Sequence, residues 1–170
     1  MKRLLSILIA IVSVGLSTVS AQDAKYKALF IYNFTKQIEW PASEKSGDFV
    51  ICVVNHNELF SQLSTTVAGK KVGSQDIVVK KLKSIDEVTK CHILFLASSV
   101  SNASNMESVI NKLGASASLI VTERQGALKN GSCINFLIRD DKLKFEMSSD
   151  AIASRKLQVS SSLTNVAISN

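Results

Sequence analysis

Residues 49–54 read FVICVV, an unbroken run of apolar and largely β-branched side chains. A strand of this kind fits a sheet whose two faces are both covered, which is the usual setting of parallel strands. Further runs of the same character occur at 77–79, 92–97 and 119–122. The four runs are therefore predicted to be strands of one largely parallel sheet.

A helix is predicted before the first of these strands, with Asp23 as its N-cap. Apolar side chains recur there at intervals of four residues, and this spacing predicts one buried face. These side chains are Tyr26, Phe30, Phe34 and Ile38, and Leu29 and Ile31 add to the apolar face. The helix is expected to end at Trp40 and Pro41, because the residue before a proline is pushed out of helical geometry.

Further helices are predicted between the strands. Residues 57–66 carry apolar positions at helical spacing, and 84–87 and 104–107 have the Ser-x-x-Glu spacing of a capping box. The last of these boxes opens a helix that Gly114 is expected to end. Strands that alternate with helices predict parallel crossovers, with helices on both faces of the sheet.

Residues 134–138 and 142–147 are predicted to form an antiparallel hairpin. The second arm alternates apolar and charged residues, which favours a place at the edge of the sheet with one wet face. The expected fold is therefore an α/β, three-layer α/β/α sandwich. Its sheet is mostly parallel and flavodoxin-like, with an antiparallel edge hairpin.

The N-terminus has the features of a secretory signal peptide. Lys2 and Arg3 give a positive start, an apolar stretch follows at 4–16, and the small residues at 19–21 precede Gln22. A retained membrane anchor is the alternative, but the apolar stretch is shorter than the roughly 20 residues that a membrane span needs. We expect cleavage before Gln22 and export to the periplasm.

Removal of the signal peptide, residues 1–21, leaves 22–170 as a single domain. The signal peptide holds two of the chain's 20 basic residues and none of its 14 acidic ones, so the exported chain has a formal charge of +4. No aromatic residues that could stack on bases lie among its clustered lysines, and a nucleic-acid partner is therefore not expected. These lysines are Lys70, Lys71, Lys80, Lys81, Lys83 and Lys90.

The strand ends carry little that could support catalysis. The first strand is followed by Asn55 and His56 with no glycine-rich phosphate loop, and no Gly-x-Ser-x-Gly elbow occurs. His92 is expected to form hydrogen bonds with the backbone. No cysteine stands at zinc-ligand spacing from either histidine. The sequence predicts no catalytic residues, no cofactor and no metal site.

The chain has three cysteines, Cys52, Cys91 and Cys133, which permit at most one internal bridge. Three pairings are open on sequence grounds. Cys52 and Cys91 lie on strands that are neighbours in the flavodoxin-like order, which is a geometric argument for that pair. The alternative is three buried free thiols that act as small apolar side chains.

Residues 27–41 read KALFIYNFTKQIEWP, which strongly resembles the opening signature of the YfiR family of periplasmic regulators. Its signature residues are Tyr32, Asn33, Phe34, Lys36, Glu39, Trp40 and Pro41. The resemblance continues through the segments at 49–54, 91–96, 119–122 and 131–136, and it ends with 157–166. It covers essentially the whole exported chain.

The resemblance implies a non-enzymatic periplasmic repressor that binds the periplasmic sensor domain of an inner-membrane diguanylate cyclase. Repression lowers cyclic di-GMP and biofilm formation, and an outer-membrane lipoprotein that sequesters the repressor is a second implied partner. Cys52 and Cys91 fall where the family forms its long-range disulfide. Cys133 matches one half of a second family bridge, but 122–129 offers no partner cysteine, so it is expected to be a free thiol.

Two other functions remain open. One is an accessory sensor subunit of a membrane histidine kinase. The other is a small-molecule-binding protein whose cleft would use Trp40, Tyr32 or His56, although core packing is the simpler role for these aromatic side chains. A homodimer is also left open.

The C-terminal segment is the predicted partner contact, because a serine-rich stretch has little other reason to retain apolar residues. The alternative is that these side chains seal the core. They are Leu157, Val159, Leu163 and Val166.

Overall fold

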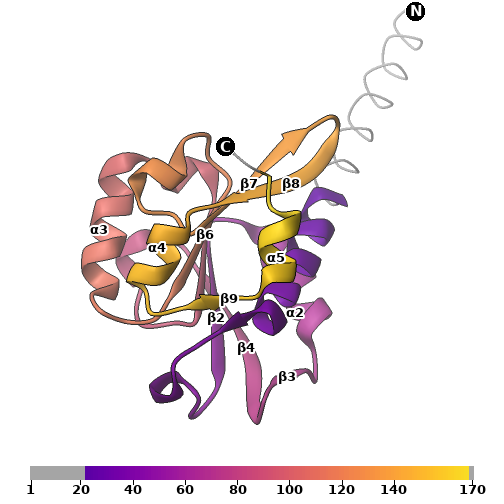
Figure 1. The fold of residues 1–170 in the computed structure, drawn as a ribbon, viewed down its shortest axis with the longest axis vertical. Helices are drawn as coiled ribbons and strands as arrows, with labels where there is room; N and C mark the ends of the chain where they lie inside the picture. Colours follow the sequence, from indigo (N-terminus) through magenta and orange to yellow (C-terminus); the bar gives the residue numbers. More distant parts are fainter. Residues whose placement is uncertain (1–21, 169–170) are drawn as a thin grey trace, which may run out of the picture.

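The computed structural model describes residues 22–168; the predicted signal peptide, residues 1–21, lies outside the described residues. A seven-stranded sheet forms the centre of the domain, in the order β3-β4-β2-β5-β6-β7-β8 (Figure 1). Its strands are β2 (Phe49–Val54), β3 (Lys71–Val72), β4 (Gln75–Leu82), β5 (Ile93–Leu96), β6 (Leu119–Thr122), β7 (Ile134–Arg139) and β8 (Lys142–Met147). A second, two-stranded sheet pairs β1 (Ile38–Glu39) with β9 (Gln158–Val159).

The strand pairing confirms the predicted α/β fold with a mostly parallel sheet. β2 pairs in parallel with β4 and β5, and β6 pairs in parallel with β5 and β7. In chain order these five strands have the flavodoxin-like arrangement 2-1-3-4-5. β8 closes one edge as the antiparallel partner of β7, as its alternating sequence predicted.

Helices lie on both sides of the sheet, as expected for a sandwich of three layers (Figure 1). α3 (Ala103–Leu113) and α4 (Ser149–Ser154) are on one side, and Arg155 links them by donating to the Gly114 carbonyl at 3.2 Å. The N-terminal helix (residues 22–37), α2 (Asn57–Val67) and α5 (Ser161–Val166) are on the other. Short 3-10 turns complete the elements: η1 (Ala42–Glu44), η2 (Ile85–Glu87), η3 (Ser98–Val100) and η4 (Ala127–Asn130).

The N-terminal helix buries only part of the predicted apolar face. Tyr26 is 47% exposed, whereas Ile31 and Phe34 are buried, as is Ile38 of β1 just beyond the helix. Ala24 and Ala28 complete the buried apolar stripe of the helix. A strict interval of four residues overshoots the 3.6-residue turn, so a stripe built on it drifts around the helix. The observed stripe mixes intervals of three and four and therefore stays on one side.

The ends of two helices also differ from the prediction. The N-terminal helix stops at residue 37, before Trp40, because Ile38–Glu39 forms β1 and pairs with β9. α3 starts at Ala103 with Asn102 as its N-cap, whose side chain accepts from the Asn105 N–H at 3.0 Å. The predicted capping box at 104–107 put the N-cap two residues after the observed one. Asn102 offers an equally good capping oxygen and takes that position.

An aromatic group holds the N-terminal helix against the edge hairpin. Phe34 stacks on Phe136 of β7 with ring centroids 6.0 Å apart, and it meets Phe145 of β8 edge-on at 5.4 Å. Phe136 and Phe145 lie opposite one another in the β7–β8 register, so both point to the same face. This contact fixes the helix over that end of the sheet.

Candidate functional site

The signature and the closing segment meet beside the main sheet, although about 120 residues separate them. β1 follows the N-terminal helix directly, and Ile38 lies opposite Val159 in the antiparallel β1–β9 pair. Ser160 strengthens the junction, because its backbone N–H donates to the Gln37 carbonyl at 2.9 Å. Its hydroxyl donates to the Gln37 side chain at 2.5 Å. The C-terminal segment is thus tied to the end of the signature helix.

Three aromatic rings pack under this junction, at the amino end of the main sheet. Trp40 meets Phe49 edge-on at 4.9 Å, and Phe49 stacks on His92 at 4.4 Å. His92 Nδ1 accepts from the Val50 N–H at 3.0 Å, so Nε2 carries the hydrogen and donates to the Glu44 carbonyl at 2.9 Å. His92 is therefore bonded to backbone on both sides, as predicted.

A cavity of about 590 Å³ opens beside these rings. This volume lies in the range of small-molecule sites, which are about 300–1,000 Å³. Its walls come from the end of the N-terminal helix, from β1 and β9, and from the β3–β4 turn. The lining residues are Lys36, Gln37, Ile38, Glu39, Trp40, Lys45, Phe49, Val72, Gly73, Ser74, Gln75, Gln158, Val159 and Ser160.

The charged side chains at the cavity carry one net positive charge. Lys45 forms an ion pair with Glu39 at 2.9 Å, and this hydrogen bond lowers the pKa of Glu39. Lys36 Nζ lies 4.3 Å from the centre of the Tyr32 ring, and Lys70 Nζ lies 4.1 Å from it. Tyr32 therefore serves as a cation–π partner for two lysines beside the cavity.

The three aromatic residues predicted for a ligand cleft do not come together. Trp40 lines the cavity, whereas Tyr32 lies outside its lining. His56 is at the opposite end of β2, where its ring nitrogen caps α2 by accepting from the Leu59 N–H at 3.2 Å. Of the other signature residues, Asn33 is exposed and Pro41 precedes η1. Only Lys36, Glu39 and Trp40 contribute to the cavity.

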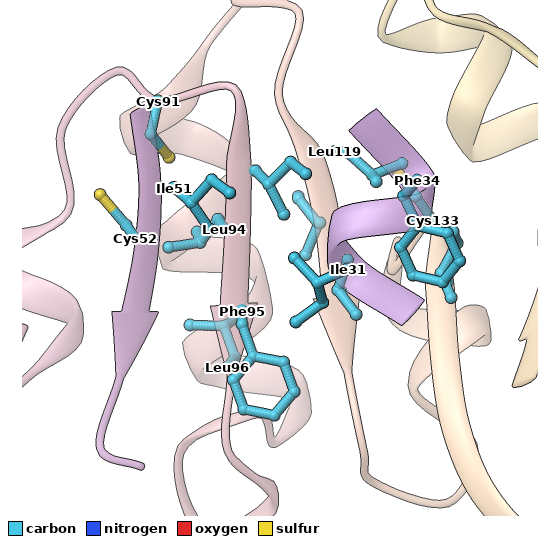
Figure 2. Packing of buried hydrophobic residues seen from close by; sticks show 14 of the residues in the cluster. Ile31, Phe34, Ile51, Cys52, Cys91, Leu94, Phe95, Leu96, Leu119 and Cys133 are labelled. Carbon is cyan, nitrogen blue, oxygen red and sulfur yellow. The ribbon is translucent and has the colours of Figure 1, made fainter. Parts of the chain in front are cut away.

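All three cysteines are buried free thiols in the structure. Figure 2 shows Cys52 on β2 and Cys91 at the turn that leads into β5, with Cys133 well apart from both. The hydrogen bond between the paired thiols lowers the pKa of Cys52. The same bond, together with burial, raises the pKa of Cys91 well above its ordinary value. Burial raises the pKa of Cys133 to about 11. The two thiols are not at disulfide distance in this structure, and the Cys52–Cys91 bridge stays a prediction.

A buried ionic cluster that the sequence reasoning missed lies at the carboxyl end of the sheet. Lys27 Nζ forms an ion pair with Glu123 at 2.6 Å and another with Asp23. Glu123 also accepts from the Ser98 N–H at 3.1 Å, so it connects the ends of β5 and β6 to the N-terminal helix. Burial alone would lower the pKa of Lys27, but the hydrogen bonds to Asp23 and Glu123 outweigh burial and raise it. The i,i+4 spacing of Asp23 and Lys27 was the available signal.

The predicted contact residues of the C-terminal segment divide into two groups. Leu157 and Leu163 are 5% and 3% exposed and belong to the core. Val159 is half-buried against the core and lines the cavity, whereas Val166 is 64% exposed. Val166 is therefore the member of this group whose side chain a partner can reach without unfolding the segment.

Neither a metal-binding cluster nor a membrane-spanning helix occurs among the described residues, 22–168. They contain no group of three or more His, Cys, Asp or Glu side chains arranged to hold a metal ion. Within the same residues, no helix has both the length and the apolar character needed to cross a membrane.

Comparison with known proteins found one family. A family profile described as YfiR/HmsC-like matches residues 24–168, which is nearly the whole described chain. No curated protein matches the chain significantly.

Proposed function

The chain belongs to the YfiR/HmsC-like family, and from this premise we propose that it is a non-enzymatic periplasmic regulator. It binds the periplasmic sensor domain of an inner-membrane diguanylate cyclase and represses that enzyme. Cyclic di-GMP and biofilm formation fall as a result. The observation that carries the proposal is the family match over 24–168, which includes both the signature helix and the closing segment.

The proposal requires export. Residues 1–21 have the charge, the apolar stretch and the small residues of a cleavable signal peptide. We therefore propose that the mature protein begins at Gln22 in the periplasm. The intact mass of protein released from the periplasm measures this directly, and a mass that includes residues 1–21 in the membrane fraction would contradict it.

A partner-binding protein must present side chains that a partner can cover. Tyr26, Leu29 and Val166 are among the large apolar residues that the described surface exposes. The first two are on the N-terminal helix and the third is on α5, which lies beside that helix (Figure 1). We propose that Val166 contributes to the contact with the cyclase, and that an outer-membrane lipoprotein competes for the repressor.

The test is a deletion of the gene, with cyclic di-GMP measured in the deletion strain and in complemented strains. Deletion should raise the nucleotide, and the wild-type gene should lower it again. Complementation with Val166→Asp should fail if this residue contacts the partner. Asn165→Asp is the matched control, because Asn165 is also exposed on α5. It should complement fully.

Two outcomes would overturn parts of the proposal. Unchanged cyclic di-GMP together with an altered histidine-kinase output would assign the protein to a kinase instead. Full complementation by Val166→Asp would leave the cyclase as partner but remove Val166 from the contact.

A further inference from the structure

We propose that the outer edge of β4 binds an extended acidic segment of a partner protein as an added strand. This edge lies on the side of β4 that faces away from β2. It uses none of the residues proposed above for the contact with the cyclase, and it does not depend on the identity of the membrane partner.

The first observation is that β3 covers only the beginning of this edge. β3 pairs with β4 only at its first two residues, and the Ile77 N–H then donates to the Lys70 carbonyl at 3.2 Å. From there to Leu82, β2 is the only partner strand of β4 in the described part of the chain. Most of β4 therefore presents a free edge.

The free groups on this edge are the N–H and C=O of Val79 and Lys81. Along a strand, successive residues direct their backbone groups to opposite sides. Ile77 uses the outer side, and Leu82, whose carbonyl accepts from the Asn55 N–H at 3.1 Å, uses the side of β2. Val79 and Lys81 therefore face outward, and no other described residue forms a hydrogen bond with their backbone groups. Unpaired groups of this kind are a template for another strand.

The second observation is that the side chains on this edge are basic. Lys80 and Lys81 are both exposed, and they point to opposite faces of the sheet because side chains alternate along a strand. Neither forms an ion pair with another described residue. Lys71 on β3, by contrast, is paired with Asp76 at 2.6 Å. Two cations are therefore available to an incoming strand.

An acidic strand meets both needs. Its backbone pairs with Val79 and Lys81, as in other complexes in which a peptide extends a sheet. Its carboxylates lie opposite Lys80 and Lys81, where opposite charges across a strand pair are favourable. The half-buried side chains of Val78 and Val79 favour apolar residues at the next two positions.

A second copy of this chain fits the edge less well. It would bring two further lysines to Lys80 and Lys81, and like charges across a strand pair are unfavourable. Lysines on an edge strand are a common protection against pairing with a like strand. The same charges thus discourage self-association and select a partner of opposite sign.

The probe is the peptide Thr-Glu-Glu-Val-Val-Thr with blocked ends, which places its glutamates opposite the lysines in an antiparallel pair. The comparison is the same peptide with lysines in place of the glutamates, which should bind about tenfold more weakly. In ¹⁵N-labelled protein, the glutamate peptide should shift the amide signals of Val79 and Lys81 in a saturable way and slow their hydrogen exchange. The amides of Val78 and Lys80 already face β2 and should keep their exchange rates.

Three variants separate charge from backbone pairing. Lys81→Gln should weaken binding of the glutamate peptide about two- to fivefold, the range for an exposed charge pair. Lys81→Pro also removes the outward N–H and should weaken binding by about a further two- to tenfold, the range for one hydrogen bond. Proline is tolerated there because this N–H takes no part in the sheet. Lys142→Gln is the matched control, since Lys142 is an exposed lysine on β8, the opposite edge strand, and it should leave binding unchanged.

Three results would overturn the proposal. One is the absence of any shift at millimolar glutamate peptide, and another is equal binding of the two peptides. The third is movement of the Val79 and Lys81 signals with protein concentration alone, which would show that a second copy occupies the edge. Each of these leaves the regulatory proposal intact, because the cyclic di-GMP measurement does not depend on the peptide.

Discussion

Replacement of Lys27 by Met tests whether the buried ionic cluster holds the N-terminal helix to the sheet. The Lys27 side chain is 7% exposed, and that of Glu123 is 15% exposed. Loss of one partner of a buried ion pair costs about 3–5 kcal/mol, because the other charge is left without compensation. Here Asp23 is 31% exposed and Glu123 keeps its bond from the Ser98 N–H, which limits the penalty. We therefore expect a loss of about 2–3 kcal/mol, somewhat below the range for fully buried pairs.

Equilibrium unfolding in urea, followed by the fluorescence of the only tryptophan, measures this loss. For a domain of this size, each kcal/mol corresponds to about 2–4 °C in Tm. The matched control is Lys25→Met on the exposed side of the same helix, which should change stability by no more than about 0.5 kcal/mol. A double-mutant cycle with Glu123→Gln isolates the pair. Equal stability of the two Met variants, or no coupling between Lys27 and Glu123, would refute the reasoning.

The raised pKa of Lys27 makes the same contribution depend on pH: it is fully present below the ordinary pKa of 10.5 and is lost as the pH rises through the raised value. The unfolding free energies of wild type and Lys27→Met should therefore converge in alkaline titrations, and a constant difference would contradict this. Cys52 and Cys91 enclose about 40 residues, so the predicted disulfide should stabilise the oxidised protein by about 4 kcal/mol. Peptide mapping without reductant checks the pairing, and alkylation of both thiols would rule it out. Leu163→Asp should destabilise the fold by about 3 kcal/mol or more, because it places a charge in the core. Val166→Asp should leave Tm unchanged. If thermal melts gave the same Tm for the two variants, the assignment of Leu163 to the core and Val166 to the surface would be wrong.

Local patterns predicted much of the secondary structure. The run at 49–54 coincides with β2, and the alternating arm at 142–147 coincides with β8. Both signals are properties of neighbouring residues in the chain, so they can be read without the fold. The buried face of the N-terminal helix was predicted only in part. Ile31 is buried but Tyr26 and Leu29 are exposed, because all three are apolar and only the position of the sheet decides which are covered.

The candidate site was predictable only in part. The signature residues Lys36, Glu39 and Trp40 were identified by resemblance, and all three line the cavity. The cavity itself was not predicted, because its other walls come from the β3–β4 turn and β9. No local pattern indicates that segments so far apart in the chain form one hollow.

The sequence alone determined the α/β class, the order of the main strands, and the family, because each depends on local composition or on a contiguous signature. The short strands β1, β3 and β9 were not predicted. The tertiary structure decided what the polar and reactive side chains face. It set Lys27 between Asp23 and Glu123, and it placed Cys91, just before β5, near Cys52 on β2. These arrangements follow from parallel crossovers, which bring strand ends far apart in the chain to the same edge of a sheet.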